Sequence, residues 1–430
     1  MQSPSLSNHF KERVPSSIRQ AQIKFSNRED KKNVEVINLA IGNVSLPIYP
    51  SMRKRMENLS NNNSFAMGKI PYTSTVGLKE TRDAFLKAIS TLDIDVSNLF
   101  TSITDGGSSS MEIMLLGVCG PSSKKPIMLL DPSYTNYLQF CKRLDIPVLS
   151  TDRLLRDDGT FAPLNFDKIL DTIKIHKPAA LIIIPYDNPT GQFLNQNIIN
   201  KIAKICIENE IWLISDEAYR PMVFTNENPS SVWKIPHKMI PDKFYFRVSI
   251  ESASKVWNAC GLRIGGLVTD SKDFHLNAVS EYTANLCANH LGQYIFGALA
   301  NESALKIKKW YSEQNKYYKN LFKMMKNSLI EELPGVIVSE PEASIYCIID
   351  FKKIANENFD SDNFVNFCAE KGSVKIDQQM YTVLLAPIKG FYKNSHIGRT
   401  QVRLALVESS QLLETAPKVI STLFKDFSKL

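Results

Sequence analysis

The sequence has little that would support metal or disulfide chemistry. Its seven cysteines show no CxxC spacing, and its six histidines stand apart from one another. Zinc sites need Cys or His ligands at close and characteristic spacing, so we expect no metal site. Most of the cysteines lie in apolar runs, which favours buried free thiols in a reducing compartment. We therefore expect a cytoplasmic protein.

Long apolar segments are also missing. No stretch of 18 apolar residues occurs, so we predict no membrane span. Residues 1–28 are polar and mixed, without an apolar core of signal-peptide length, so no signal peptide is expected. The net charge of +7 comes from scattered lysines with acids between them. This pattern is typical of a solvated surface and does not indicate nucleic-acid binding.

Two common nucleotide-binding signatures are absent as well. We find neither GxGxxG after an apolar run nor GxxxxGK, which argues against a Rossmann dinucleotide site and a P-loop. There is no internal repeat of fixed period, so a solenoid is excluded. The 430 residues are 43% apolar and 22% charged, which is typical of a globular protein long enough for two domains.

Short apolar runs alternate with helical stretches through most of the chain. This alternation predicts an α/β fold with a mostly parallel central sheet and helices on its faces. The pattern changes after about residue 289, where residues 301–332 predict one long amphipathic helix. Strands and shorter helices follow it, which predicts a second, smaller α+β domain. The predicted strands of the first part are residues 100–104, 127–130, 148–150, 180–184, 212–215, 246–250 and 267–269.

One lysine stands in a context that suits covalent chemistry. Lys255 ends the run Ser252-Ala253-Ser254-Lys255, and Arg263 follows eight residues later. A lysine amine can condense with an aldehyde cofactor. A fixed arginine suits bidentate capture of a phosphate, which the two serine hydroxyls would complete. Taken alone, this segment is equally compatible with a solvated lysine beside a turn.

Two segments upstream place further polar side chains at strand ends. Asn188 follows the apolar run at residues 181–184, and Asp216 follows the run at residues 211–214, with Tyr219 close behind. Asn188 and Asp216 are 28 residues apart with a helical stretch between them, which is βαβ spacing. Ligands of open α/β sheets bind at the carboxyl ends of the strands. We therefore expect an amide, a carboxylate, a phenol and the lysine to converge on one crevice.

These residues resemble a known family. Residues 252–265 fit the cofactor-attachment pattern of the pyridoxal-phosphate-dependent aminotransferases of fold type I, class I/II, and the resemblance extends from about Ile37 to the C-terminal helix. It implies fold type I with an N-terminal segment (1–45) that packs on the small domain, a large cofactor-binding domain (46–295) and a small domain (296–430). The matching residues occur in the family's order, which is Tyr72, Gly106-Gly107-Ser108, Tyr134, Asn188, Asp216, Tyr219, Lys255, Arg263 and Arg403.

The resemblance implies a role for each matching residue around pyridoxal 5'-phosphate. Lys255 would carry the cofactor and shuttle a proton. Asp216 would pair with the pyridine nitrogen and keep it protonated. Tyr219 and Asn188 would hydrogen-bond the phenolic oxygen of the ring, and Tyr134 would stack on it. The remaining cofactor contacts would be made to the phosphate, by Gly107, Ser108, Ser252, Ser254 and Arg263.

Substrate and subunit contacts are implied in the same way. Arg403 would clamp the α-carboxylate of the substrate, and Gly42 would let backbone amides approach the same group. Arg399 lies only four residues earlier and is an alternative for the clamp. Tyr72 would reach the phosphate of a neighbouring subunit, so that a homodimer would share its active sites. For Tyr72, Tyr134, Asn188 and Asp216, ordinary packing, turn or capping roles remain as alternatives.

The expected reaction is amino-group transfer between an L-amino acid and a 2-oxo acid, in a ping-pong cycle through pyridoxamine phosphate. A carbon–sulfur β-lyase or another elimination enzyme on the same fold would use the same residues. A non-enzymatic regulator is a third alternative. We rank it last because Lys255, Asp216 and Arg403 are all present. The segment after Gly42 and the triplet 108–110 differ from the usual pattern, so they leave the substrate open.

Overall fold

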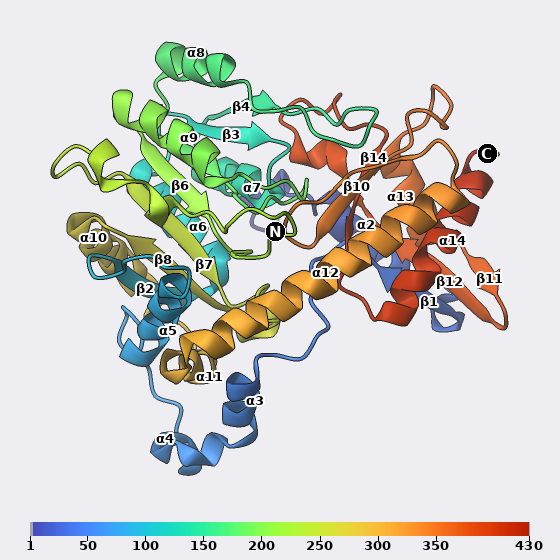
Figure 1. Cartoon of the computed structure of the whole chain (residues 1–430). Coiled ribbons are helices and arrows are strands. Elements are labelled where there is room, and N and C mark those ends of the chain that lie inside the picture. Colours follow the sequence, from blue (N-terminus) through green and yellow to red (C-terminus); the bar gives the residue numbers. More distant parts are fainter. Residues whose placement is uncertain (1–2, 430) are drawn as a thin grey trace. The chain divides into compact units, whose positions relative to one another are not determined.

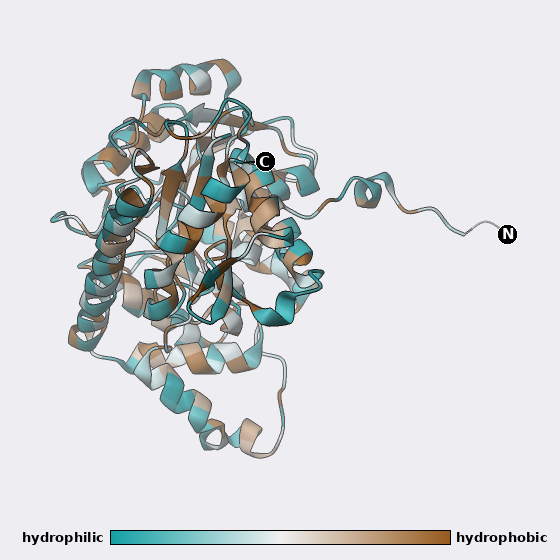
Figure 2. Cartoon of the chain, turned by 90° about the vertical axis from the view of Figure 1, so that its right-hand side faces the viewer, coloured by the Kyte–Doolittle hydropathy of each residue, from teal (hydrophilic) through white to brown (hydrophobic). Residues whose placement is uncertain are grey.

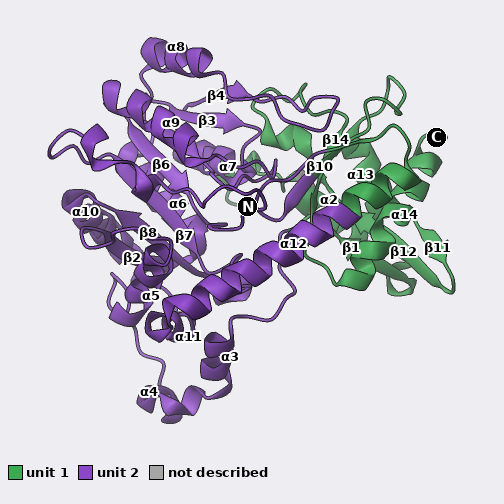
Figure 3. Cartoon of the chain, viewed as in Figure 1, with its two compact units in different colours: residues 1–41, 325–338, 348–430 green, residues 42–324, 339–347 purple. Residues whose placement is uncertain are grey.

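The computed structural model describes residues 3–429 and contains two compact units (Figure 3). The larger unit comprises residues 42–324 and 339–347, and the smaller one comprises residues 325–338 together with the described residues before 42 and after 347. The sequence predicts divisions after residues 45 and 295. In the structure, residues 296–324 and 339–347 pack with the larger unit. The assignment of these parts as separate domains stays a prediction.

A seven-stranded sheet forms the centre of the larger unit (Figure 1). Strands β3 to β7 run parallel, whereas β8 is antiparallel to both of its neighbours, β7 and β2. The strands in spatial order are β2 (Phe100–Asp105), β8 (Ile264–Thr269), β7 (Arg247–Ser252), β6 (Trp212–Asp216), β5 (Ala180–Ile183), β3 (Ile127–Asp131) and β4 (Val148–Asp152). The predicted mostly parallel α/β sheet is therefore confirmed.

Helices flank this sheet, and polar side chains cap some of them at the N-terminus. Asn165 and Asn195 accept hydrogen bonds from backbone amides in the first turns of α8 and α9, which is the usual N-cap role of asparagine. Helix α12 begins in the larger unit and continues into the smaller one. The helices are α3 (Pro50–Glu57), α4 (Asn63–Ala66), α5 (Lys79–Ser90), α6 (Gly106–Val118), α7 (Thr135–Leu144), α8 (Phe166–His176), α9 (Gln196–Glu208), α10 (Lys272–Tyr282), α11 (His290–Gly297) and α12 (Ala304–Glu332).

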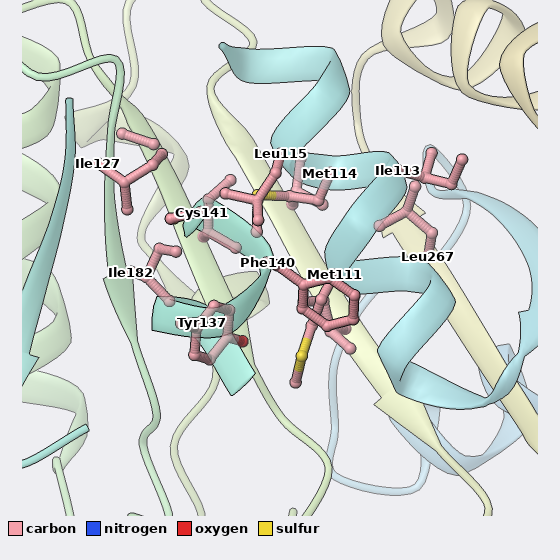
Figure 4. Close-up of a cluster of buried hydrophobic side chains, with 14 of the residues drawn as sticks. Met111, Ile113, Met114, Leu115, Ile127, Tyr137, Phe140, Cys141, Ile182 and Leu267 are labelled. Carbon is pink, nitrogen blue, oxygen red and sulfur yellow. The ribbon is translucent and has the colours of Figure 1, made fainter. Parts of the chain in front are cut away.

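One hydrophobic cluster of the larger unit joins the sheet to helices α6, α7 and α10, and Figure 4 shows part of it. Strand β5 is buried along its whole length, as expected for a parallel strand covered on both faces. This burial explains why its sequence is a continuous apolar run. In Figure 2 the strands are mostly hydrophobic, whereas the helices carry hydrophilic residues on part of their surface.

The smaller unit contains two further sheets, with the orders β1-β12-β11 and β13-β14-β10-β9. Strand β1 (Val34–Asn38) pairs with β12 (Gln379–Leu384) in parallel within this unit. The elements of this unit are α1 (Asn8–Lys11), α2 (Ser17–Ser26), β1 (Val34–Asn38), β9 (Ile337–Val338), α13 (Ser361–Glu370), β11 (Val374–Ile376), β12 (Gln379–Leu384), β13 (Ala386–Pro387), β14 (Gln401–Ala405) and α14 (Ser410–Phe427). Strand β10 (Tyr346–Asp350) begins in the larger unit and continues into this one. Within residues 3–429, no helix is both long enough and apolar enough to cross a membrane.

Candidate active site

The carboxyl ends of several strands meet at one edge of the large sheet. Strand β6 ends at Asp216, which lies beside Ile250 of β7, and β7 ends at Ser252. Strand β2 also ends at this edge, because it and β7 are both antiparallel to β8. The turn with Asn188 follows β5, so its polar groups come to the same edge. The sequence prediction that these segments share an edge agrees with this topology.

Lys255 is half-buried, and its amine donates a hydrogen bond to the carbonyl of Gly42. No carboxylate pairs with this amine among the described residues. A methyl group added at Gly42 would lie 3.1 Å from the Lys255 nitrogen and 2.3 Å from the Tyr346 hydroxyl oxygen. Only glycine therefore allows the lysine and the tyrosine to approach the backbone so closely at this point.

Asp216 is a buried carboxylate without a cationic partner in the part of the chain that the structure describes. Its Oδ2 accepts a hydrogen bond of 2.9 Å from the Tyr137 hydroxyl, and its Oδ1 accepts one of 3.2 Å from the Ala218 amide. Burial raises the pKa of Asp216 from 3.8 to about 6, although both hydrogen bonds oppose the change. A cation brought against this carboxylate would be strongly attracted to it.

Tyr219 follows the end of β6 by three residues and is also buried. Its hydroxyl oxygen is 2.9 Å from that of Tyr346, and the two rings meet edge to face with centroids 5.7 Å apart. Burial raises the pKa of Tyr219 well above its ordinary value, and the neighbouring Tyr346 adds to this effect. The phenol therefore keeps its proton at neutral pH and can donate it in a hydrogen bond.

A second set of residues surrounds the N-terminus of α6. A methyl group added at Gly106 would lie 2.3 Å from an Arg263 guanidinium nitrogen, and one added at Gly107 would lie 3.8 Å from the Cβ of Ser252. Arg263 is exposed, and within residues 3–429 it has no carboxylate partner. A 13-residue helix presents unpaired backbone amides at its N-terminus. The adjacent Arg263 guanidinium donates one hydrogen bond of 3.1 Å to the Cys260 carbonyl, and its charge makes the place suitable for a phosphate.

The other predicted cofactor residues lie on the same segments. Asn188 is buried in the turn after β5, where Asp187 accepts a hydrogen bond of 2.8 Å from Arg153. Ser254 is buried directly before Lys255, and Ser108 is half-buried in the first turn of α6. Tyr134 stands directly before α7, with its ring 6.4 Å from that of Tyr137. The particular role of each of these residues stays a prediction.

Tyr72 differs from this group because it is 80% exposed. Its loop is held in place from both sides. The Pro71 carbonyl is 3.0 Å from a ring nitrogen of His290, and the Thr73 hydroxyl accepts a hydrogen bond of 2.9 Å from Gln293. An exposed tyrosine on an anchored loop is available to a neighbouring molecule.

Arg403 belongs to the smaller unit. It lies in the middle of β14 and is 3% exposed. Its guanidinium donates a hydrogen bond to the Ala40 carbonyl and lies over the Phe391 ring, 5.1 Å from the centroid. Arg399 is exposed in a turn before the strand and donates to the Glu357 carbonyl at 2.7 Å. Of the two arginines, only Arg403 is held on a strand, so its position is the better defined.

Three features of the site therefore fit pyridoxal phosphate. Among the described residues these are an amine without a carboxylate partner, a buried carboxylate without a cation, and a helix N-terminus beside an arginine that has no carboxylate partner. They match the aldehyde, the pyridine nitrogen and the phosphate of the cofactor, in that order. The comparison with known proteins agrees. The family model described as "Aminotransferase class I and II" matches residues 34–416. The chain belongs to this family.

Individual relatives are similar over most of their length. An aspartate aminotransferase of Sulfurisphaera tokodaii is 25% identical over 362 residues, which cover 81% of this chain and 83% of the relative. A solved Thermus thermophilus aspartate aminotransferase has a TM-score of 0.79 at 18% identity and covers 98% of this chain and 100% of its own. A Pyrococcus horikoshii kynurenine aminotransferase, solved with PMP, has a TM-score of 0.78 at 18% identity, covering 99% and 98%.

The predicted family, fold type I, enzyme class and cofactor are thereby confirmed. This aminotransferase uses pyridoxal 5'-phosphate and catalyses transamination, and the lyase alternative is not favoured. The structure also adds two residues that sequence reasoning missed. Tyr137 bonds to Asp216, and Tyr346 bonds to Tyr219. Tyr137 could have been found because it lies one helical turn after Tyr134, whereas Tyr346 stands in an apolar run without any signal.

The shifted pKa of Asp216 predicts a gain in stability for one variant. In the cofactor-free protein, the folded state holds the proton of this carboxyl more tightly than the unfolded chain does, with a pKa of about 6 against 3.8. Stability from this group is therefore full below pH 3.8 and lost as the pH rises through 6. Asp216→Asn removes the titration, so it should stabilise the cofactor-free protein at pH 8 by about 1–3 kcal/mol.

Denaturant unfolding at pH 4 and pH 8 measures this difference. The variant and the wild type should have similar stability at the lower pH and should diverge at the higher one. The exposed Asp242 offers a control, because Asp242→Asn makes the same change of charge on the surface. Equal stability of Asp216→Asn and the wild type at pH 8 would contradict the proposed burial of an uncompensated charge.

Proposed function

We propose that Lys255 carries the cofactor and moves the proton during transfer of an amino group between an L-amino acid and a 2-oxo acid. The observation behind this proposal is an amine without a carboxylate partner at the strand edge that also holds the buried Asp216. When bound there, pyridoxal phosphate supplies a ring that stabilises negative charge on the substrate Cα. Lys255 would accept the proton from Cα as a general base and deliver it to C4′ of the cofactor as a general acid.

The other residues of the edge would bind and orient the cofactor. Asp216 would hold a proton on the pyridine nitrogen, and its own link to Tyr137 fixes the direction of the carboxylate. Tyr219 and Asn188 would donate hydrogen bonds to the phenolic oxygen of the ring. Tyr134 would cover one face of the ring and exclude water from it. The proposed phosphate ligands are Gly107, Ser108, Ser252, Ser254 and Arg263.

Substrate recognition would rest on the α-carboxylate that all amino acid donors share. We propose Arg403 as the bidentate partner of that group, with Gly42 leaving room for it. A buried guanidinium held on a strand supports this role, because it is already oriented before a substrate arrives. The names of the relatives include aspartate and kynurenine as substrates, so these two amino acids are the first donors to test.

Product analysis tests the proposed reaction. The purified enzyme with aspartate or kynurenine as donor and 2-oxoglutarate as acceptor should form glutamate in amounts equal to the donor consumed. Omission of the acceptor should stop turnover after a single half-reaction. Continued release of pyruvate and ammonia without an acceptor would instead point to an elimination enzyme. Lys255→Ala serves as the blank, since no other group of the site replaces the proton carrier.

The proposed clamp predicts a difference between two neighbouring arginines. Arg403→Ala should lower kcat/KM by about 100-fold or more for every amino acid, because a charge-assisted pair is lost with the common carboxylate. Arg399→Ala is the matched control and should change kcat/KM by less than about 3-fold, because that exposed side chain bonds only to the backbone carbonyl of Glu357. Steady-state kinetics on two donors decide the matter, and the reverse ranking would reassign the clamp.

We further propose a homodimer in which Tyr72 serves the partner's phosphate site. The support is a small exposed surface that includes Met67, Ile70 and Tyr72, which are 63%, 64% and 80% exposed. Apolar side chains this exposed are suited to burial against another subunit. The hydrogen bonds that anchor the loop would keep Tyr72 in a fixed position relative to the partner subunit.

Mixed dimers test whether Tyr72 acts across the interface. Tyr72→Ala and Lys255→Ala subunits are unfolded together and refolded as a mixture, so that about half of the dimers contain one subunit of each kind. If Tyr72 serves the partner, each mixed dimer has one complete site, and the mixture should regain about a quarter of the wild-type activity. A mixture no more active than its separate components would show that Tyr72 acts within its own chain or has no role.

We also propose that the protein works in the cytoplasm. All seven cysteines are free thiols in the structure, and burial raises the pKa of several of them, among them Cys141 to about 12. Thiols that are buried and unpaired are typical of a reducing compartment. Recovery of the enzyme in a secreted or oxidising fraction of its cells would contradict this assignment.

A further inference from the structure

The contact between Tyr219 and Tyr346 has no role in the function described so far. Both side chains are buried, at 5% and 2% exposure, and their hydroxyl oxygens are 2.9 Å apart. The two rings cross at 74°, so packing as well as the hydrogen bond fixes them against each other. A hydroxyl pair enclosed in this way has few other orientations available.

The number of hydroxyl protons limits the hydrogen bonds that Tyr219 and Tyr346 can donate. Each phenol has a single O–H group and can accept hydrogen bonds on its oxygen. If Tyr219 used its proton towards Tyr346, it would have none left for another acceptor. If Tyr346 donates instead, the Tyr219 oxygen accepts and its own proton stays available. Donation by Tyr346 also polarises the Tyr219 hydroxyl, because linked hydrogen bonds strengthen one another.

We propose that Tyr346 is a positioning residue that donates its hydroxyl proton to Tyr219 and so directs the Tyr219 proton at the phenolic oxygen of the cofactor ring. This inference rests on the proposed role of Tyr219. Tyr346 itself need not touch the cofactor. Its effect on the reaction passes entirely through the oxygen of Tyr219.

The backbone around Tyr346 supports such a role. Residues 339–347 are bonded to loops of the larger unit that flank the site. The Ser344 hydroxyl donates to the Asp187 carbonyl at 2.8 Å, directly before Asn188, and the Ser344 amide donates to the Met222 carbonyl at 3.0 Å, shortly after Tyr219. The backbone of Tyr346 also packs closely on Gly191, since a methyl group added at Gly191 would lie 2.5 Å from the Tyr346 carbonyl oxygen. The segment that carries Tyr346 is thus fixed to the segments that carry Asn188 and Tyr219.

Gly42 limits the hydroxyl from the other side. The Tyr346 oxygen would lie only 2.3 Å from a methyl group at this position, so it rests directly on the glycine backbone. The Lys255 amine bonds to the carbonyl of the same glycine. The Tyr346 hydroxyl and the Lys255 amine therefore both contact the backbone of Gly42.

An absorbance titration of the cofactor-loaded enzyme tests the inference without relying on turnover. A hydrogen bond donated by Tyr219 stabilises negative charge on the ring oxygen, which lowers the pKa of the visible chromophore. Tyr346→Phe keeps the ring packing and removes only the hydroxyl, so this pKa should rise by roughly 0.5–1 unit. Tyr219→Phe should raise it at least as much, and the double variant should titrate like Tyr219→Phe alone, because Tyr346 acts through Tyr219.

Tyr311→Phe is the matched control. Tyr311 is also a buried tyrosine of the larger unit, 6% exposed, with its hydroxyl 3.5 Å from the Ala88 carbonyl. Its loss should leave the titration unchanged, and thermal unfolding of all the variants confirms that each one folds. The inference is overturned if Tyr346→Phe titrates like the wild type while Tyr219→Phe shifts, or if the double variant shifts further than Tyr219→Phe. If Tyr219→Phe itself causes no shift, the proposed role of Tyr219 fails, and this inference with it.

Discussion

The burial of one carboxylate is the constraint on which the site depends. Asp216 ends β6 in a place that solvent does not reach, and its hydrogen bonds from Tyr137 and Ala218 do not offset the loss of water. The fold tolerates this charge because the neighbouring strands are well packed and buried. In the proposed arrangement a protonated ring nitrogen of the cofactor is the missing partner, so the burial that weakens the cofactor-free protein would strengthen its hold on the cofactor.

The carboxylate, the amine and the proposed phosphate site come from three different connections of the sheet. The carboxylate comes from the end of β6, the amine from the segment after β7, and the phosphate cradle from the N-terminus of α6 after β2. Each group stands on a different strand connection, yet all of them end at one edge. The common direction of the strands thus brings together groups that are far apart in sequence, whereas in a P-loop one continuous motif supplies them.

The sequence reveals the parts of the site that depend on strand ends. Asp216, Asn188 and Lys255 each follow an apolar run, and a parallel sheet brings such residues together whatever the details of packing. Tyr346 could not be found in this way. Its importance comes from a contact with Tyr219 across 127 positions of sequence, and nothing in the run around it distinguishes it from a core aromatic. The pairing of β1 with β12 could not be predicted from the sequence either, because pairing between strands far apart in sequence depends on how their side chains pack in the folded protein.

The most direct test of the account follows the proton on the cofactor ring. The enzyme is loaded with pyridoxal phosphate carrying ¹⁵N in the ring, and the nitrogen chemical shift is recorded at pH 8 for the wild type and for Asp216→Asn. The account predicts a protonated nitrogen in the wild type and an unprotonated one in the variant, since only the carboxylate stabilises the charge. An unprotonated nitrogen in the wild type, or the same shift in both proteins, would contradict it.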